Sequence, residues 1–422
     1  MPTSYGYYDP RLGIAWQPKS LPGTAVRAGF GLFAGPLAYD NYNSTGAIAP
    51  FCPTYVFSGT AAAPISMQNP WAGFAATGGK SPFPSFAQNV NVSASQAIFL
   101  TPFALNAVFS PAFRPGITQS WNASVEQQLT GTIALHMAYV GSESFHQGTR
   151  IDVNPGIFAN KNARTTYPLF GLIREEFSVG TASYHSLQIG LDKRFSHGLQ
   201  FHSSFTWEKG IDLQSLGNAS FGAALGDPFS LSWNRGISDL NFPIISVSNF
   251  IYTSPALKGH NSILRQVAGA WEISGIWTMQ SGSPIGVVGG AGNDNSGSLQ
   301  SGDRADVVPG QPFDIRQGGR AHWLKSYFNT AAFAINAPGT FGTSARNFMT
   351  TPPINTADLG LMKNWSIRDR YGVQFRWEMY NALNHPSFAG PNVTPGSAAI
   401  GQITAIGVIP PRLMEGGLKV TF

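Results

Sequence analysis

Apolar and polar residues alternate along several short stretches of the chain. In residues 371–379 every odd position is apolar and every even position is glycine, polar or charged. Side chains of a β-strand point alternately to the two faces of a sheet, whereas a helix would spread these two sets around its circumference. The same separation recurs in residues 121–129, 133–139, 187–195, 199–207 and 271–279. The pattern predicts a sheet with one apolar and one polar face.

The connections between the predicted strands alternate in length. About eleven strands are predicted, at residues 11–17, 24–34, 117–129, 132–142, 181–195, 199–209, 244–254, 270–280, 355–366, 371–383 and 411–422. Short turns are predicted at residues 18–23, 130–131, 196–198, 256–269 and 368–370, and long connections at 35–116, 143–180, 210–243, 281–354 and 384–410. A soluble β-sandwich also has alternating strands, but it has no reason to place every long loop at one end. Short periplasmic turns and long extracellular loops are typical of transmembrane barrels.

The fold class is therefore predicted to be all-β, an antiparallel up-and-down transmembrane β-barrel with long extracellular loops. Bacterial single-chain barrels have even strand numbers. Eleven strands that end at the periplasm are expected to be the second half of a barrel of about 22 strands. The whole chain, residues 1–422, is then one partial barrel domain.

Composition supports a membrane barrel over a soluble domain. Only 11% of residues are charged, against about 25% in typical soluble domains. No apolar run approaches the ~18 residues that a membrane helix needs. The net charge of +5 comes from scattered Lys and Arg, so no nucleic-acid partner is expected. Cys52 is the single cysteine, which excludes an internal disulfide.

The end of the chain carries a separate signal. Leu418, Val420 and Phe422 alternate with Lys419 and Thr421. A last strand of this kind that ends in Phe resembles the signal recognised by the bacterial barrel-assembly machinery. That machinery and outer-membrane lipid are the expected partners.

Motifs in a fixed order resemble the β-barrel domain of Oar-like TonB-dependent receptors. They lie at residues 10–16 (PRLGIAW), 26–33 (VRAGFGLF), 119–126 (QSWNASVE), 138–142 (AYVGS), 184–188 (YHSLQ), 193–207, 275–282 (GIWTMQSG), 338–342 (PGTFG), 358–361 (DLGL) and 381–386 (NALNHP). The family usually has an Arg-His pair where this chain has Asn241, Phe242 and Pro243. The resemblance covers the C-terminal half of such a receptor. A signal peptide, plug domain and TonB box are not found, so the TonB complex is expected to act only through the missing plug of a full-length parent.

No catalytic, cofactor-binding or metal site is predicted. Residues 293–297 (NDNSG), with Asp303 and Asp306, place oxygen ligands as a calcium loop does, but the terminal bidentate Glu is absent. A solvated loop is the favoured interpretation. The glycine-rich residues 286–292 do not open a helix within a βαβ unit, so phosphate binding is not expected.

Several strand residues are assigned to the two faces of the wall. Arg27, Arg194, Arg376 and Glu378 are predicted to face the lumen, where they could line a substrate path; pairing with one another or with the plug is the favoured interpretation. His185 and His202 lie within strands, where a girdle or lumen role is expected. Tyr139, Tyr184, Trp207 and Trp277 are predicted to form an aromatic girdle at the membrane interface, as Trp and Tyr commonly do.

The favoured function is that of a partial outer-membrane receptor or transporter. The alternative is a surface barrel for adhesion or structure without transport, and a secreted enzyme is the least favoured. The substrate is not encoded in a recognisable motif, because specificity lies in variable loops.

Three expectations follow from these assignments. Residues 143–180, 210–243 and 281–354 should be extracellular, while Thr130 and Ser196 should be periplasmic. Phe375 and Leu191 should face hydrocarbon, and Gln374 and Asp192 the lumen. The chain should not close a barrel alone, because strands 11–17 and 411–422 would leave unpaired edges.

Overall fold

The computed structural model describes residues 8–35, 65–72, 78, 102–215, 225–290, 292–300, 302–313, 320–367 and 371–422. Cys52, most of the connection 35–116 and the turn 368–370 lie outside these residues. Statements about the structure below refer to the described part of the chain.

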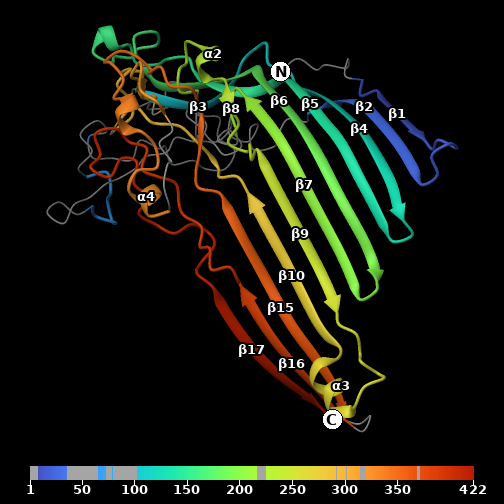
Figure 1. Ribbon diagram of the computed structural model, residues 1–422. Helices are drawn as coiled ribbons and strands as arrows, with labels where there is room; N and C mark the ends of the chain where they lie inside the picture. The colour runs from blue at the N-terminus through green and yellow to red at the C-terminus, as the bar shows by residue number, and fades with distance from the viewer. Residues whose placement is uncertain are drawn as a thin grey trace.

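The strands form one wall in which sequence neighbours are sheet neighbours, apart from two short additions (Figure 1). The main path is β1 (Arg11–Trp16), β2 (Thr24–Ala34), β4 (Ile117–Thr130), β5 (Ile133–Asp152), β6 (Phe170–Ser196), β7 (Leu199–Asp212), β9 (Ile244–Thr253), β10 (Trp271–Gln280), β15 (Ile354–Ile367), β16 (Tyr371–Tyr380) and β17 (Leu413–Thr421). All neighbours on this path are antiparallel. The predicted up-and-down order of eleven strands is confirmed.

The strand register keeps the apolar residues on one face of the wall. One row across five strands runs from Val26 through Val125, Met137 and Ile189 to Phe205. The adjacent row carries Ala25, Glu126, His136, Gly190 and Ser204. A slip of one residue in any pair would move that strand's apolar set to the other face. From β2 to β7 the wall thus has one apolar face and one polar face, whereas Val247, Ile251 and Ile276 lie on the polar side of β9 and β10.

The strand register places the test positions on opposite faces of the wall. Phe375 lies opposite Lys363 and Leu418, while Gln374 lies opposite Asn364 and Lys419. Leu191 pairs with Leu135 on the apolar face, and Asp192 pairs with His202 on the polar face.

Glycine on the apolar face makes room for aromatic rings from neighbouring strands. A Cβ at Gly141 would lie 2.5 Å from Cε2 of Trp121, and a Cβ at Gly275 would lie 2.7 Å from Cε1 of Phe250. Both pairs are direct partners or near partners in the register. The rings therefore lie flat on the wall only because these positions carry no side chain.

The two ends of the wall differ, as the connection lengths predict. At one end only two residues separate β4 from β5 and β6 from β7. His197 and Gly198 both have positive φ, 51° and 79°, as a two-residue hairpin turn requires. The connection from β9 to β10 at this end is longer and contains helix α3 (Ser262–Ala268). We call this the hairpin end.

The opposite end carries the long connections, which we call the cap (Figure 1). Its short elements are β3 (Phe103–Phe109), η3 (Phe158–Asn160), α2 (Leu231–Asn234), β8 (Gly236–Ile237), β11 (Pro284–Ile285), β12 (Asp306–Val307), α4 (Arg320–Lys325), η5 (Thr330–Ala332), β13 (Phe333–Ala334) and β14 (Met349–Thr350). None of the described helices is long and apolar enough to cross a membrane.

The prediction of a loop at residues 143–180 was wrong. β5 continues to Asp152 and β6 begins at Phe170, so most of this segment is a two-stranded ribbon that extends beyond the other strands. β3 runs parallel to β6 along it. Register shifts at Gln147 interrupt the pairing, and each shift exchanges the two faces. The period-two pattern is therefore lost in the sequence although the strands continue.

The cap has a hydrophobic core of its own. It consists of Val287, Ala305, Tyr327, Phe328, Ala332, Phe333 and Ile403, from two of the long connections. The rings of Phe328 and Phe333 meet edge to face with centroids 5.7 Å apart. The cap is thus a folded unit packed on the end of the wall.

Candidate functional site

The polar face of the wall carries charges that are paired with one another. Arg376 Nη2 lies 2.9 Å from Glu378 Oε1, as predicted. Arg27 pairs with Glu126, and His202 Nδ1 lies 2.6 Å from Asp192 Oδ1. Arg194 donates a hydrogen bond of 2.8 Å to the Gly131 carbonyl instead of pairing with an acid. The charges of this face are only partly paired, because Glu415 lies directly opposite Glu378, and Glu208 and Glu272 make no salt bridge with the described residues.

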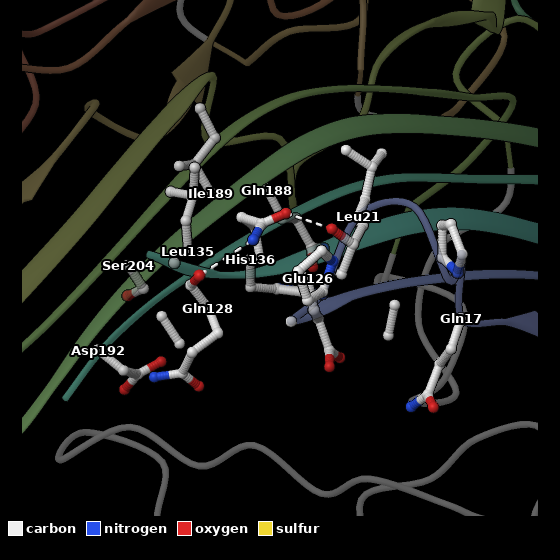
Figure 2. A pocket seen from close by; sticks show the side chains of 18 of the residues that line it. Gln17, Leu21, Glu126, Gln128, Leu135, His136, Gln188, Ile189, Asp192 and Ser204 are labelled. Carbon is white, nitrogen blue, oxygen red and sulfur yellow. Dashed lines mark hydrogen bonds between the residues drawn. The ribbon is translucent and has the colours of Figure 1, made fainter. Parts of the chain in front are cut away.

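Part of the polar face is hollowed near the hairpin end. A cavity of about 950 Å³ lies among β4 to β7 and the turn between β1 and β2. Figure 2 shows Glu126, Gln128 and Asp192 on one side of the ribbon and Leu135 and Ile189 on the other. Polar and apolar residues that alternate in the sequence therefore point to opposite sides of the wall.

Buried charges join the extended ribbon to the rest of the cap. Arg150 Nε lies 2.9 Å from Glu176 Oε2, and both side chains are almost fully buried. Asp152 accepts from Arg164 Nη1 at 2.6 Å and from Gln300 Nε2 at 2.6 Å. Burial raises the pKa of Glu176, although the hydrogen bond and charge of Arg150 oppose that shift. Buried pairs of this kind fix geometry more than they add stability.

A second cavity, of about 350 Å³, lies inside the cap between the end of β7 and the connection 281–353. Arg304 and Arg346 both line it, together with Trp233. Arg346 is held in place by Asp212, with 2.7 Å between Nη1 and Oδ1. Its second nitrogen donates to Ser215 Oγ at 2.5 Å.

Arg304 is placed differently from Arg346. Its guanidinium carbon lies 3.5 Å from the ring centroid of Trp233, and Nη2 donates to the Trp233 carbonyl at 2.5 Å. Within the described residues it makes no salt bridge. Burial, and then the nearby charge of Arg346, lower the pKa of Arg304 to about 10, so it stays charged at neutral pH. A stacked guanidinium beside a cavity is suited to binding a carboxylate or another acceptor-rich group.

The interpretation of residues 293–297 as a solvated loop was wrong. Ser296 and Asp303 are buried, and Asp303 Oδ2 accepts from Ser296 N at 2.7 Å and Asn336 Nδ2 at 3.1 Å. Asp294 accepts from Leu299 N at 3.2 Å. These polar side chains bond to one another within the cap, although Asp303 Oδ1 is buried with no hydrogen-bond partner among the described residues. No group of three or more His, Cys, Asp or Glu suited to a metal ion occurs in the described part of the chain.

The predicted girdle residues do not all share one face. Tyr139 and Trp207 both pair with Leu187 on the apolar face, and Trp277 lies on the same face opposite Ala357. Tyr184 lies on the polar face, where its hydroxyl donates to Glu208 Oε2 at 2.8 Å. The assignment of Tyr184 to the girdle is therefore wrong, because alternation places it three positions, an odd number, from Leu187. For the other three the girdle stays a prediction.

His185 takes the position that Tyr184 was expected to fill. It lies on the apolar face, 2.8 Å from the Tyr139 hydroxyl through Nδ1, and its ring centroid is 6.0 Å from that of Trp121. At the chain end, Leu418 and Val420 lie on the apolar face opposite Phe375 and Val373. Phe422 is almost fully exposed just beyond β17. Recognition of these three residues by the assembly machinery stays a prediction.

The buried charged residues of the cap were not predicted from the sequence. Arg150, Asp152 and Asn154 are spaced by two, and their side chains are all buried. That spacing was available as a signal for a strand with a buried polar face. Arg304 and Arg346 gave no local signal, because 42 positions separate them (346 minus 304) and only the folded cap brings them together.

Comparison with known proteins agrees with the wall described above. A family model of the outer membrane beta barrel domain matches residues 1–415. The chain belongs to this family. No curated protein matches it.

Three solved structures similar to this barrel domain are much longer chains. The outer membrane transporter YddB from Escherichia coli has 10% identity and a TM-score of 0.49, covering 98% of this chain and 40% of that one. The FrpB iron transporter from Neisseria meningitidis has 11% identity and a TM-score of 0.42, covering 98% and 39%. BauA, the ferric preacinetobactin receptor from Acinetobacter baumannii, has 13% identity and a TM-score of 0.41, covering 98% and 36%. The chain spans less than half the length of these proteins.

Membership of this family indicates what each face of the wall contacts. The protein is located in the outer membrane. In such barrels the apolar face contacts lipid and the polar face lines the interior. The paired charges and the cavity near the hairpin end therefore lie on the inner side of the wall. The family is one of membrane barrels rather than of enzymes.

Proposed function

We propose that this chain is the C-terminal wall and cap of an Oar-like TonB-dependent receptor that moves a bulky solute across the outer membrane. The observation that carries the proposal is the polar face of β2 to β7, which leads from the cap to the hairpin end, together with the pairing of Arg27 and Arg376 with acids on the same side of the wall. A face of this kind lets a hydrophilic solute pass without a strong binding site along the path. Arg304 in the cap cavity supplies a charged contact at the entrance.

The cap is assigned to the extracellular side and the hairpin end to the periplasm. Barrels have short periplasmic turns and long extracellular loops. Thr130 and Ser196 then lie at the periplasm, and the cap elements outside the cell.

The wall is proposed to be completed by a further segment to a total of about 22 strands. Within the described residues β1 and β17 each pair with one strand only. Unpaired backbone groups in hydrocarbon cost several kcal/mol each, so the two edges need partners. A plug that contacts the TonB complex would belong to that further segment. Leu418, Val420 and Phe422 are proposed to direct the wall to the barrel-assembly machinery.

A surface role without transport is the second candidate. The observation that favours it is the hydrophobic core of the cap. A folded cap can present a fixed surface to another cell or matrix, whereas loops that only admit a solute need no core. Both functions share the same topology.

Cysteine labelling tests the topology. Cys52 is first replaced by serine, and Ser232→Cys in the cap is compared with Ser20→Cys in the turn between β1 and β2; both positions are exposed. A membrane-impermeant maleimide should label position 232 in intact cells and position 20 only after the outer membrane is opened. Labelling of position 20 in intact cells would refute the orientation.

Solute depletion separates transport from the surface role. Cells lacking the protein and cells making it are supplied with a panel of oligopeptides, ferric siderophores and oligosaccharides. Wild-type cells should deplete at least one solute faster, and Arg304→Ala should lower that rate. Lys325→Ala, an exposed cation of the cap, is the matched control and should not. Equal depletion of every solute by both strains, with normal surface labelling, would favour the surface role.

A further inference from the structure

The connection between β9 and β10 is much longer than the two-residue turns at the same end of the wall. It lies at the hairpin end, where two residues are enough to join β4 to β5 or β6 to β7. This connection runs from 254 to 270 and contains α3. A helix is not needed to reverse the chain here, so its position and surface call for an explanation.

Helix α3 is attached to the lipid side of the wall. Trp365 Nε1 donates to the Gln266 carbonyl at 2.9 Å, and Trp271 Nε1 donates to the Val267 carbonyl at 2.7 Å. Lys363 Nζ donates to the Gly269 carbonyl. Trp271 and Lys363 are direct register partners on the apolar face, and Trp365 lies two positions further along it. The last turn of α3 therefore sits against the lipid-facing surface.

The three wall residues form an interface site around a buried cation. The Lys363 amine lies 5.2 Å from the ring centroid of Trp271 and 5.6 Å from that of Trp365, and the side chain is only 2% exposed. Tryptophan and the long lysine side chain commonly mark the boundary between hydrocarbon and headgroups. The level of α3 is thus that of the membrane surface.

The free side of α3 is apolar. Ile263 and Val267, one turn apart on the same side of the helix, are 77% and 64% exposed, and Leu264 is 40% exposed. No described side chain of the wall covers them. These residues continue the lipid-facing surface beyond the end of the strands.

The connection that contains α3 carries positive charge. Residues 254–270 include Lys258, His260 and Arg265 and no Asp or Glu. Lys258 and Arg265 are exposed. A short helix with large apolar side chains and flanking cations has the properties of a segment that lies in a membrane interface. Its cations are suited to the phosphates of anionic lipids.

We propose that α3 is a membrane anchor that binds phospholipid of the periplasmic leaflet. Ile263, Leu264 and Val267 enter the acyl region, while Lys258 and Arg265 bind headgroup phosphates. The leaflet follows from the orientation given under the proposed function, on which this inference rests. Lipid is the occupant because the apolar side of α3 is continuous with the lipid-facing wall, and because the exposed Lys258 and Arg265 lie in the same connection.

Fluorescence quenching tests the contact with lipid. The protein, purified from the outer membrane with Cys52→Ser and a single Ile263→Cys, carries an environment-sensitive fluorophore in vesicles of phosphatidylethanolamine and phosphatidylglycerol. Its emission should shift to the blue and be quenched by nitroxide-labelled lipid. The same label at Ser20→Cys, in the turn between β1 and β2, is the matched control and should be quenched only by aqueous iodide. Equal behaviour at the two positions would refute the anchor.

A second arm tests the cations and separates the two proposals. Lys258→Glu with Arg265→Glu should reduce lipid quenching at position 263, and the reduction should be larger in vesicles that contain phosphatidylglycerol than in phosphatidylcholine alone. An equal effect in both lipids would refute recognition of anionic headgroups, because phosphatidylcholine has a phosphate but no net charge. In whole cells, position 263 should react with an impermeant maleimide only after the outer membrane is opened and detergent is added. Reaction in intact cells would refute the orientation, while lipid quenching in vesicles would still support a lipid contact at the other leaflet.

Discussion

Replacing Ile189 with arginine tests which face of the wall meets the hydrocarbon. Ile189 lies between Met137 and Phe205 on the apolar face, and its neighbour Gln188 lies on the polar face. Figure 2 shows Ile189 pointing away from the polar residues of the cavity. The matched substitution Gln188→Arg introduces the same side chain one position away, on the same strand and at the same depth.

The depth of Ile189 follows from the strand geometry. Four positions separate it from Lys193, whose amine donates to the Ser196 carbonyl at 3.4 Å at the hairpin end. Four residues span about 13 Å along a strand, or about 10 Å along the membrane normal at a tilt of about 40°. Half of a hydrophobic band of about 25 Å is about 12 Å, so Ile189 lies near the midplane. Phe375 is a poorer test position, because it lies opposite Lys363 near the membrane surface.

Arginine at the midplane of the lipid face destabilises a barrel by ~2–4 kcal/mol. Gln188→Arg should cost much less, because the new cation lies on the hydrated polar face. The free energy of unfolding is measured by guanidinium titration of protein purified from the outer membrane and placed in phospholipid vesicles, followed by tryptophan fluorescence. If Ile189→Arg does not assemble, Ile189→Gln gives a smaller loss on the same face. Equal losses for the two arginine variants would refute the assignment of faces.

Three further predictions concern the packing of the wall and the cap. Gly141→Ala places a methyl against the ring of Trp121 and should cost ~1–3 kcal/mol in the same titration, whereas Gly416→Ala, where a Cβ meets nothing within 4 Å, should cost little; equal costs would contradict the close approach. Phe328→Ala in the cap core should cost ~3–5 kcal/mol locally, seen as faster proteolysis of the cap with an unchanged wall, and unchanged proteolysis would count against a folded cap. Burial raises the pKa of Asp294 above its ordinary 3.8, so the contribution of this carboxyl to cap stability is fully present below pH 3.8 and is lost as the pH rises through the raised value. Limited proteolysis across this range should show a flatter profile for Asp294→Asn, and an unchanged profile would contradict this linkage.

The wall from β2 to β7 could be predicted from the sequence because its residues alternate regularly outside residues 143–180. The row that contains Ile189 is apolar on every strand from β2 to β7, and each strand pairs with its neighbour in sequence. Both the alternation and the strand pairing therefore involve residues that are close together in the sequence. The prediction failed at residues 143–180, where the shifts at Gln147 break the alternation although the strands continue. The prediction for Tyr184 was wrong because it rested on residue type alone. Tyr184 is three positions from Leu187 on the same strand, so the two side chains point to opposite faces.

The cap could not be predicted because its contacts join residues that are far apart. Val287, Phe328 and Ile403 meet in one core although no repeat links them in the sequence. Polar residues such as Asp303 bond to other residues of the cap, so a composition typical of a solvated loop conceals a buried network. Helix α3 was likewise concealed within a segment that was predicted to be a turn.

The hydrogen bond from Gln300 to Asp152 has a consequence for the order of assembly. These residues are 148 positions apart, whereas neighbouring wall strands on the path from β4 to β10 follow one another in the chain. Contacts over long sequence separations form late, because the intervening chain must first be ordered. The hairpins from β5 to β10 must therefore be in place before Gln300 can reach its partner. Closure of the cap is then a late event on the folding pathway. A protease-resistant cap indicates that the strands between Asp152 and Gln300 have already paired correctly.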